Sequence, residues 1–180
     1  MARFRMRPVL VALGTFGLLG GLYYGPGLVI GPQAHAQNSA VRDHVDRIAA
    51  AVDEYQAMTG GRFPEPHDWV GTLARNKLLA ADRLPTSPWS REGQLEPLTI
   101  APGDTRLVRA SAIARGASPT PGGTPLGEGY PPREGRVDDH TFGAMLYDHD
   151  PASGVYVLYG IGRRKNHEAV VAHVVTNRKP

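Results

Sequence analysis

The chain has 180 residues, of which 22 are glycine, 16 are proline and none is cysteine, and 41% are hydrophobic. This length suits one modest globular domain with an additional segment, rather than two full domains. The absence of cysteine excludes a disulfide framework, a thiol nucleophile, lipid attachment through cysteine, and cysteine-based zinc or iron–sulfur sites.

The net charge of +3 originates at the N-terminal tip. Arg3, Arg5 and Arg7 precede the first acidic residue, Asp43, and from position 37 onward basic and acidic residues are equal in number. Nucleic-acid binding needs a basic surface that neutralises phosphates. The body of the chain has no such excess of charge, so we expect no nucleic-acid partner and interpret the basic run 163–165 as a solvated turn.

Residues 8–34 carry no formal charge, and the apolar stretch 8–30 is long enough to cross a bilayer as a helix of about 20 residues. Cationic residues stay on the cytoplasmic side, so the preceding arginines predict that the chain after about residue 35 lies outside the cytoplasm. Ala34-His35-Ala36 also has the small-x-small pattern of a signal-peptidase site. Residues 1–36 are therefore predicted to be an inner-membrane anchor or a signal peptide cleaved after Ala36, and residues 37–180 an exported domain of the cell envelope, periplasmic or secreted if cleaved.

An amphipathic helix is predicted over residues 38–60. Apolar side chains recur every three or four positions there, at Val41, Val45, Ile48, Val52, Tyr55 and Met58. Asn38 or Ser39 is suited to cap the first turn, and Gly60-Gly61 is suited to end the helix before Pro64. The pattern predicts a helix that begins at Asn38 and buries one stripe against a core.

A shorter helix is predicted over about residues 66–77, with Trp69 and Leu73 on one face. The following Leu84-Pro85 and Ser87-Pro88-Trp89 are typical of turns. We therefore expect an irregular connection between the helices and whatever follows residue 95.

Short segments rich in β-branched and aromatic residues predict the strands of a small antiparallel sheet. They cover residues 98–100, 106–109, 142–147, 155–159 and 170–175, the last three forming an antiparallel region over 142–176. The clearest hairpin has its turn-forming loop at 148–154. Residues 111–136, rich in glycine and proline, predict a long surface loop. The expected fold class is α+β, with the N-terminal apolar segment and the amphipathic helix packed on a small antiparallel sheet.

Motifs that carry catalysis were sought next. His167, Glu168 and His173 lack the spacing of a helical zinc site, and Gly160-Ile161-Gly162 predicts a bend after a strand rather than a dinucleotide loop. Asp148 and Asp150 belong to the densest gathering of oxygen and nitrogen ligands, a composition that suits calcium, but the sequence does not continue as a calcium-hand loop. We expect no enzyme activity, cofactor or metal; a metal-dependent exported enzyme using these carboxylates is an alternative.

The order of features resembles a type IV pilin-like protein, closest to the major pseudopilin of type II secretion systems. The resemblance rests on the basic tip, the apolar segment, the helix ending near Tyr55, the stretch Gly60-Gly61-Arg62-Phe63-Pro64, and the pair Leu84-Pro85 and Pro88-Trp89. Residues 156–162, with the sequence YVLYGIG, are similar to a strand near the C-terminus of that family. Two family features are absent: the processing site with its glutamate, since no acid precedes Asp43, and the acidic calcium loop.

The resemblance implies a noncatalytic structural or interaction subunit of a type II secretion or type IV pilus-like machine. Its implied partners are the inner membrane and other pilin-like subunits or secretion-machine proteins, with residues 111–136 carrying partner specificity. The residues implied to build the helix, the connection and the closing strands are Val41, Val45, Ile48, Val52, Tyr55, Pro64, Pro85, Trp89, Tyr156 and Tyr159. The alternative is an exported soluble binding or accessory domain released by signal peptidase.

Overall fold

The computed structural model describes residues 7–79, 86–89, 96–127, 129–130, 142–164 and 167–178, with side chains from residue 33 onward. The chain divides into two compact units, Met1–Ala36 and Gln37–Pro180. Among the residues so described, no helix is long and apolar enough to cross a membrane. The side chains of the predicted anchor, 8–30, lie outside the described set.

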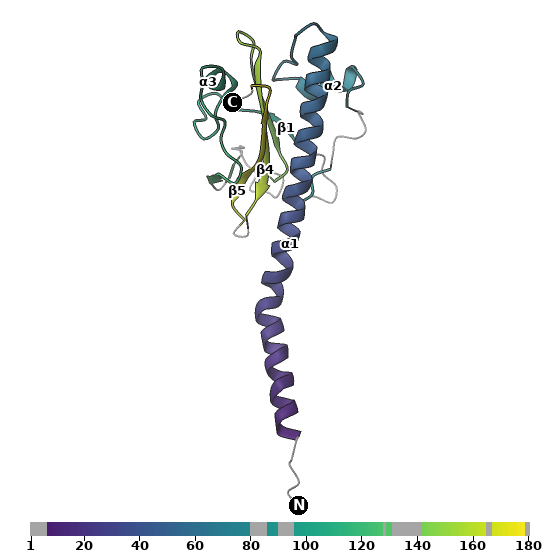
Figure 1. The fold of residues 1–180 in the computed structure, drawn as a ribbon, viewed down its shortest axis with the longest axis vertical. Coiled ribbons are helices and arrows are strands. Elements are labelled where there is room, and N and C mark those ends of the chain that lie inside the picture. The colour runs from purple at the N-terminus through teal and green to yellow at the C-terminus, as the bar shows by residue number, and fades with distance from the viewer. Residues whose placement is uncertain are drawn as a thin grey trace, which may run out of the picture. The chain divides into compact units, whose positions relative to one another are not determined.

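The elements of the second unit form a sheet with a layer on each face (Figure 1). In chain order the elements are α1 (Arg7–Met58), α2 (Trp69–Arg75), β1 (Pro97–Thr99), α3 (Ala110–Ala114), β2 (Pro125–Gly127), β3 (Met145–Asp150), β4 (Val155–Arg163) and β5 (Ala169–Thr176). The strand order is β1-β3-β4-β5-β2. The α+β class expected from the sequence is confirmed.

The sheet is mixed rather than antiparallel throughout. Strands β3, β4 and β5 form the antiparallel meander predicted within 142–176, and β2 adds antiparallel to β5. Strand β1, however, pairs parallel to β3, with Leu98 opposite Leu146. A parallel pair needs a long crossover connection, and the chain between β1 and β3 supplies one. The predicted hairpin is tighter than expected, because β3 extends to Asp150 and leaves only residues 151–154 as the turn.

The part of α1 in the second unit, residues 37–58, packs on one face of the sheet. Its stripe is fully buried at Val41, Val45, Ile48 and Val52, and it joins side chains of β3 and β4 in one cluster. The helix ends as predicted, at a left-handed pair of glycines, Gly60 (φ 69°) and Gly61 (φ 100°). It does not begin at Asn38, because α1 continues through that residue.

Asn38 of α1 and Gly160 and Gly162 of β4 bring the helix close to the sheet. The side-chain amide of Asn38 accepts from the Arg163 N–H and donates to the Arg163 carbonyl, both at 3.0 Å. A Cβ at Gly160 would lie 2.6 Å from methyl groups of both Val41 and Val45. Asn38, predicted to cap the helix, therefore bonds α1 to β4 instead. Residues 160–162, predicted to form a bend, lie inside β4, where the absence of a side chain at Gly160 lets the helix pack close to the strand.

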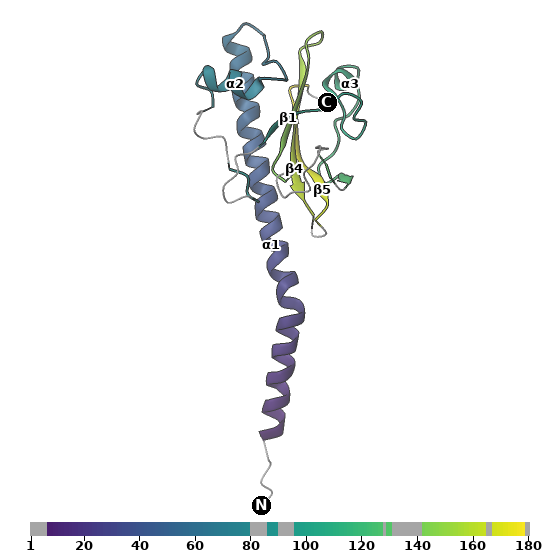
Figure 2. The same cartoon turned by 180° about the vertical axis from the view of Figure 1, so that it is seen from behind.

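The opposite face of the sheet is covered by residues 100–127 and 129–130, which we call the cover segment (Figure 2). Its buried side chains are Ile100, Leu107, Ala110, Ile113, Leu126 and Tyr130. Within the predicted long surface loop 111–136, α3 and β2 are regular elements that the prediction lacked, whereas residues 115–124 between them form turns and irregular chain and are mostly exposed. Residues 128 and 131–136 lie outside the described part. The predicted strand 106–109 is also absent, since these residues form no strand. Glycines such as Gly116 (φ 104°) make tight turns here.

Candidate interaction surface

Asp148 anchors the cover segment to the sheet. Side chains alternate along β3, so Asp148 faces the cover segment, where it is only 6% exposed. Its carboxylate accepts from the Arg109 guanidinium at 2.8 and 3.3 Å and from the Ala110 N–H, at the start of α3, at 2.9 Å. This pairing raises the pKa of Arg109. Asp148 is thus a structural anchor for α3.

Asp150, the other predicted metal candidate, has a different partner. Its carboxylate accepts from the Ser153 hydroxyl at 2.6 Å, within the β3–β4 turn. Among described residues, no group of three or more histidine, cysteine, aspartate or glutamate side chains is placed to hold a metal ion. The structure therefore gives Asp148 and Asp150 separate structural contacts and does not assemble them into a ligand set.

Tyr159 makes a second anchor for the cover segment. Its hydroxyl donates to the Val108 carbonyl at 2.9 Å and accepts from the Thr120 N–H at 3.3 Å, and the Thr120 hydroxyl accepts from the Val108 N–H at 3.1 Å. Burial raises the pKa of Tyr159. The Tyr159 side chain is fully buried, and its hydroxyl links the stretch around Val108 to the stretch around Thr120.

The other residues that the resemblance implied are also part of the core or the connection. Tyr156, on the α1 face, donates a hydrogen bond from its hydroxyl to Asp53 at 2.9 Å. Its pKa is raised mainly by burial and, to a smaller extent, by this contact. Tyr55 and Trp89 are partly buried, and Pro64 is buried. Pro85 lies outside the described residues. The described side chains of this set therefore hold the fold together.

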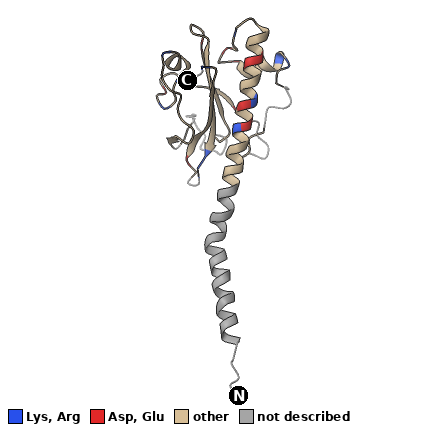
Figure 3. Cartoon of the chain, in the orientation of Figure 1, with Lys and Arg blue, Asp and Glu red and all other residues tan. Residues whose placement is uncertain are grey.

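The exposed face of α1 carries charges of both signs (Figure 3). Its charged residues in the second unit are Arg42, Asp43, Asp46, Arg47, Asp53 and Glu54. Asp46 also contacts the His173 ring on β5 at 2.7 Å. Such a face is suited to charge-patterned contact with another polar surface.

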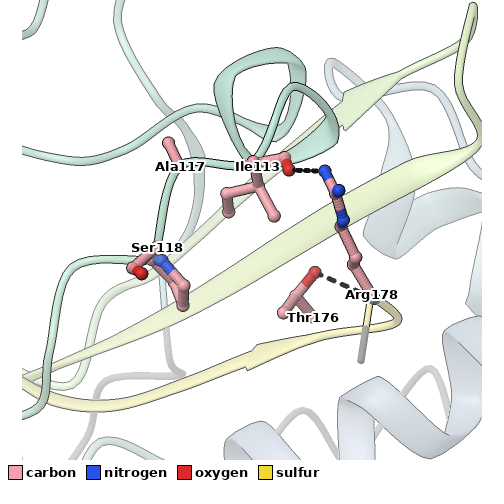
Figure 4. A pocket seen from close by; sticks show the side chains of 7 residues that line it. Ile113, Ala117, Ser118, Thr176 and Arg178 are labelled. Atoms are coloured by element: carbon pink, nitrogen blue, oxygen red, sulfur yellow. Dashed lines mark hydrogen bonds between the residues drawn. The ribbon is translucent and has the colours of Figure 1, made fainter. Parts of the chain in front are cut away.

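A small pocket lies between the end of α3 and the end of β5 (Figure 4). Its volume is about 270 Å³, and its lining residues are Ile113, Gly116, Ala117, Ser118, Pro119, Thr176 and Arg178. Most of this lining is apolar, with the hydroxyls and the guanidinium as its polar groups. A second, more open groove of about 410 Å³ lies between residues 66–71 and β1.

Arg178 is fixed across the first pocket. Figure 4 shows its side chain extending from the end of β5 to α3, where the guanidinium donates to the Ile113 carbonyl. The same carbonyl also accepts from the Gly116 N–H at 3.0 Å, so the guanidinium is its second donor. The Arg178 N–H donates to the Thr176 hydroxyl at 3.3 Å. The ion pairs found between described residues involve other arginines or His173, so no described carboxylate neutralises Arg178.

The outer edge of β5 runs toward this pocket. Strand β2 pairs only with Ala169 and Val170, and two backbone hydrogen bonds join Val171 to Gly123 and Thr124. Beyond Ala172, the described part of the chain supplies no further strand on this side. Sequence reasoning missed this site, because Ile113 and Arg178 are 65 positions apart and neither belongs to a recognisable motif. Comparison of the chain with protein-family models, with curated proteins and with solved structures found no match.

Proposed function

We propose that this chain is a noncatalytic, pilin-like subunit of the cell envelope. Its first unit anchors it in the inner membrane, and its second unit, outside the cytoplasm, contacts other subunits of a type II secretion or type IV pilus-like machine. The observation that supports this most is the fastening of α1 to the sheet at the first residues of the second unit.

That fastening has three parts. The side-chain amide of Gln37 donates to the Pro88 carbonyl at 2.9 Å, and Asn38 makes two hydrogen bonds to the backbone of Arg163. Gly160 has no side chain, so the apolar stripe of α1 packs directly on the β4 backbone. A subunit held by its N-terminal segment must pass any pulling force on to its globular part. The contacts of Asn38 let that force reach β4 directly, and that of Gln37 lets it reach the connection at Pro88, without first unwinding the helix.

The retained anchor is favoured over cleavage after Ala36 by the backbone around that residue. Residues 34–36 are helical, and the two residues that follow are held by hydrogen bonds. Proteolysis is favoured where the backbone is exposed and free of such bonds. Once the second unit has folded, the Ala-His-Ala site is therefore a poor substrate.

A released binding domain is the second candidate, and one observation favours it. Both hydrophobic clusters lie within residues 37–180, so this part has its own core on each face of the sheet. A domain with its own core does not need residues 1–36 in order to fold. Cleavage during export, before folding, would then yield a soluble protein.

The N-terminus of the protein from its native host separates these candidates. Mass spectrometry of membrane and soluble envelope fractions should find a membrane form that starts at Met1 or Ala2, unchanged by Ala36→Leu, which blocks a signal-peptidase site. A start near Thr15 would indicate pilin-type processing and would also support assembly. A soluble form that starts at Gln37, and is lost in Ala36→Leu, would overturn the anchor and support the released domain.

Contact with other subunits can be tested by crosslinking, because the chain has no cysteine of its own. Single cysteines at Asp43 and Arg47, on the exposed face of α1, should form crosslinks to neighbouring envelope subunits in intact membranes. Arg115→Cys, exposed beside α3, is the matched position away from α1. Equal crosslinking at all three positions, or none, would argue against an assembly made through α1.

A further inference from the structure

We propose that the pocket at the end of α3 and the outer edge of β5 form one docking site for the C-terminal end of a partner polypeptide. The extended backbone of the partner adds to β5, its last apolar side chain enters the pocket, and its terminal carboxylate meets Arg178. This goes beyond the proposed function, because it requires neither a membrane anchor nor a pilin-like assembly.

The size and lining of the pocket favour one apolar side chain. Its volume of about 270 Å³ lies just below the roughly 300–1,000 Å³ of pockets that enclose drug-sized ligands. Ile113, Ala117 and Pro119 give it an apolar lining. A single aliphatic or aromatic side chain buries apolar area there without leaving a polar group unpaired.

Arg178 supplies the charge that recognises a carboxylate. A guanidinium has five N–H donors in a rigid fork that matches a carboxylate. The bond to the Ile113 carbonyl uses one Nη1 donor and holds the side chain across the pocket (Figure 4). Because the other donors have no described carboxylate partner and the orientation is already set, binding an anion costs little side-chain ordering.

Beyond Ala172 no described strand pairs with the outer edge of β5, and its backbone there is suited to pair with a partner. An unpaired strand edge is a template on which an extended peptide can add through main-chain hydrogen bonds, while adjacent pockets choose its side chains. Thr176 belongs to both features, since it ends β5 and lines the pocket. A peptide whose C-terminus reaches the Thr176 end runs parallel to β5.

The test uses the full-length chain in nanodiscs and a hexapeptide probe labelled at its N-terminus, with leucine as the last residue. Fluorescence anisotropy compares three ligands: the peptide with a free carboxylate, the same peptide as a C-terminal amide, and octanoate as a competitor. We expect the free carboxylate to bind and the amide to bind at least about tenfold more weakly, the loss typical of one charge-assisted hydrogen bond. Octanoate has no backbone to pair with β5 and should compete only weakly.

The variants separate the pocket from the fold. Arg178→Gln should weaken the peptide about tenfold, and Ala117→Leu, which fills the pocket without touching the guanidinium, should weaken it similarly. Arg115→Gln, a nearby exposed arginine outside the lining, is the control and should leave affinity unchanged. Thermal unfolding of each variant shows whether the fold is retained, so a loss of binding in Ala117→Leu with an unchanged melting temperature still supports the pocket.

Several results would overturn the proposal. They are no binding of the free-carboxylate peptide up to about 1 mM, equal binding of acid and amide, unchanged affinity in both Arg178→Gln and Ala117→Leu, or octanoate competing as well as the peptide. N-methylation of alternate residues in the probe tests the edge: at least one position should lose binding, and full tolerance would exclude backbone pairing with β5. None of these results depends on where the N-terminus of the protein lies.

Discussion

The two faces of the sheet are covered in different ways. On one face lies α1, a regular helix whose backbone groups are already bonded to one another, so its contacts with the sheet are mainly those of shape. On the other face lies the cover segment, with a five-residue helix and a three-residue strand. Beside its own turns, its backbone is bonded to buried side chains of the sheet: the Ala110 N–H to Asp148, and the Val108 carbonyl and Thr120 N–H to Tyr159.

The comparison explains where each face is vulnerable. A helix held by shape tolerates loss of a polar group but not added volume, since the interior is close-packed. An irregular segment held by a few buried polar groups depends on those groups, because a buried backbone amide without a partner costs about 1–3 kcal/mol. Substitutions on the two faces should therefore differ in kind as well as in size.

The largest effect is expected on the cover face, from Asp148→Ala. This variant leaves the Ala110 N–H and the Arg109 guanidinium without their acceptor. Because Arg109 retains some contact with water, we expect a loss of about 3 kcal/mol, at the lower end for a broken buried pair. Urea unfolding measures it.

Asp150→Ala is the matched control for Asp148→Ala. Its carboxylate bonds the Ser153 hydroxyl in an exposed turn and no other group among the described residues, and surface changes of this kind usually lie within about 0.5 kcal/mol. Equal losses in the two variants would show that the cover segment does not depend on its buried anchor.

On the α1 face, Gly160→Ala tests the contact by shape. The new methyl group would lie 2.6 Å from Val41 and Val45, and overpacking of this kind costs about 1–3 kcal/mol. Combining it with Val45→Ala, which makes room, should cost less than the sum of the single changes. Gly122→Ala is the control, since its nearest atom would be 3.7 Å away; a loss as large there would argue against close packing as the cause.

The sequence predicted the elements that have a periodic pattern of apolar residues, and it did not predict the contacts between residues far apart in the chain. The stripe of α1 and the strands β3 to β5 follow from local periodicity, and residues 38–58 and 145–176 are close to their predicted places. The hydrogen bonds between Asn38 and Arg163 join residues 125 positions apart. The local pattern around Asn38 cannot show a contact so distant in sequence, and it indicated a helix cap instead. The glycines and prolines of residues 111–127 indicated a loop, because their pattern does not show that Asp148 binds the start of α3 or that Tyr159 binds Thr120.

A smaller effect is expected from Asn38, one of the residues whose polar side chains join α1 to the sheet. Asn38→Ala removes both hydrogen bonds to the Arg163 backbone, and we expect a loss of about 1–2 kcal/mol. Asn38→Asp retains the acceptor for the Arg163 N–H and should lose less. Amide hydrogen exchange at Arg163 should accelerate more in the alanine variant than in the aspartate variant; no change in either would mean that the other contacts of α1 hold the helix without Asn38.

The smallest effect concerns pH and the α1 face near the β3–β4 turn. The ring of His149 packs against that of Phe63 at a tilt, with ring centroids 4.9 Å apart. Burial lowers the pKa of His149 below the ordinary 6.5, although the Glu65 and Asp150 carboxylates oppose this. The unfolded chain therefore takes up a proton near pH 6.5 that the folded chain resists, so stability falls as the pH drops through that value. His149→Phe retains an aromatic ring without the titration and should flatten the dependence between pH 7.5 and 5.5 in urea unfolding, about two units that span the ordinary histidine pKa. His67→Phe, at an exposed position, should leave the slope unchanged. Equal slopes of stability against pH in the unchanged protein, His149→Phe and His67→Phe would show that the packing of His149 on Phe63 does not exclude the charged ring. The α1 face would then be less tightly packed near the β3–β4 turn than at the buried stripe of α1.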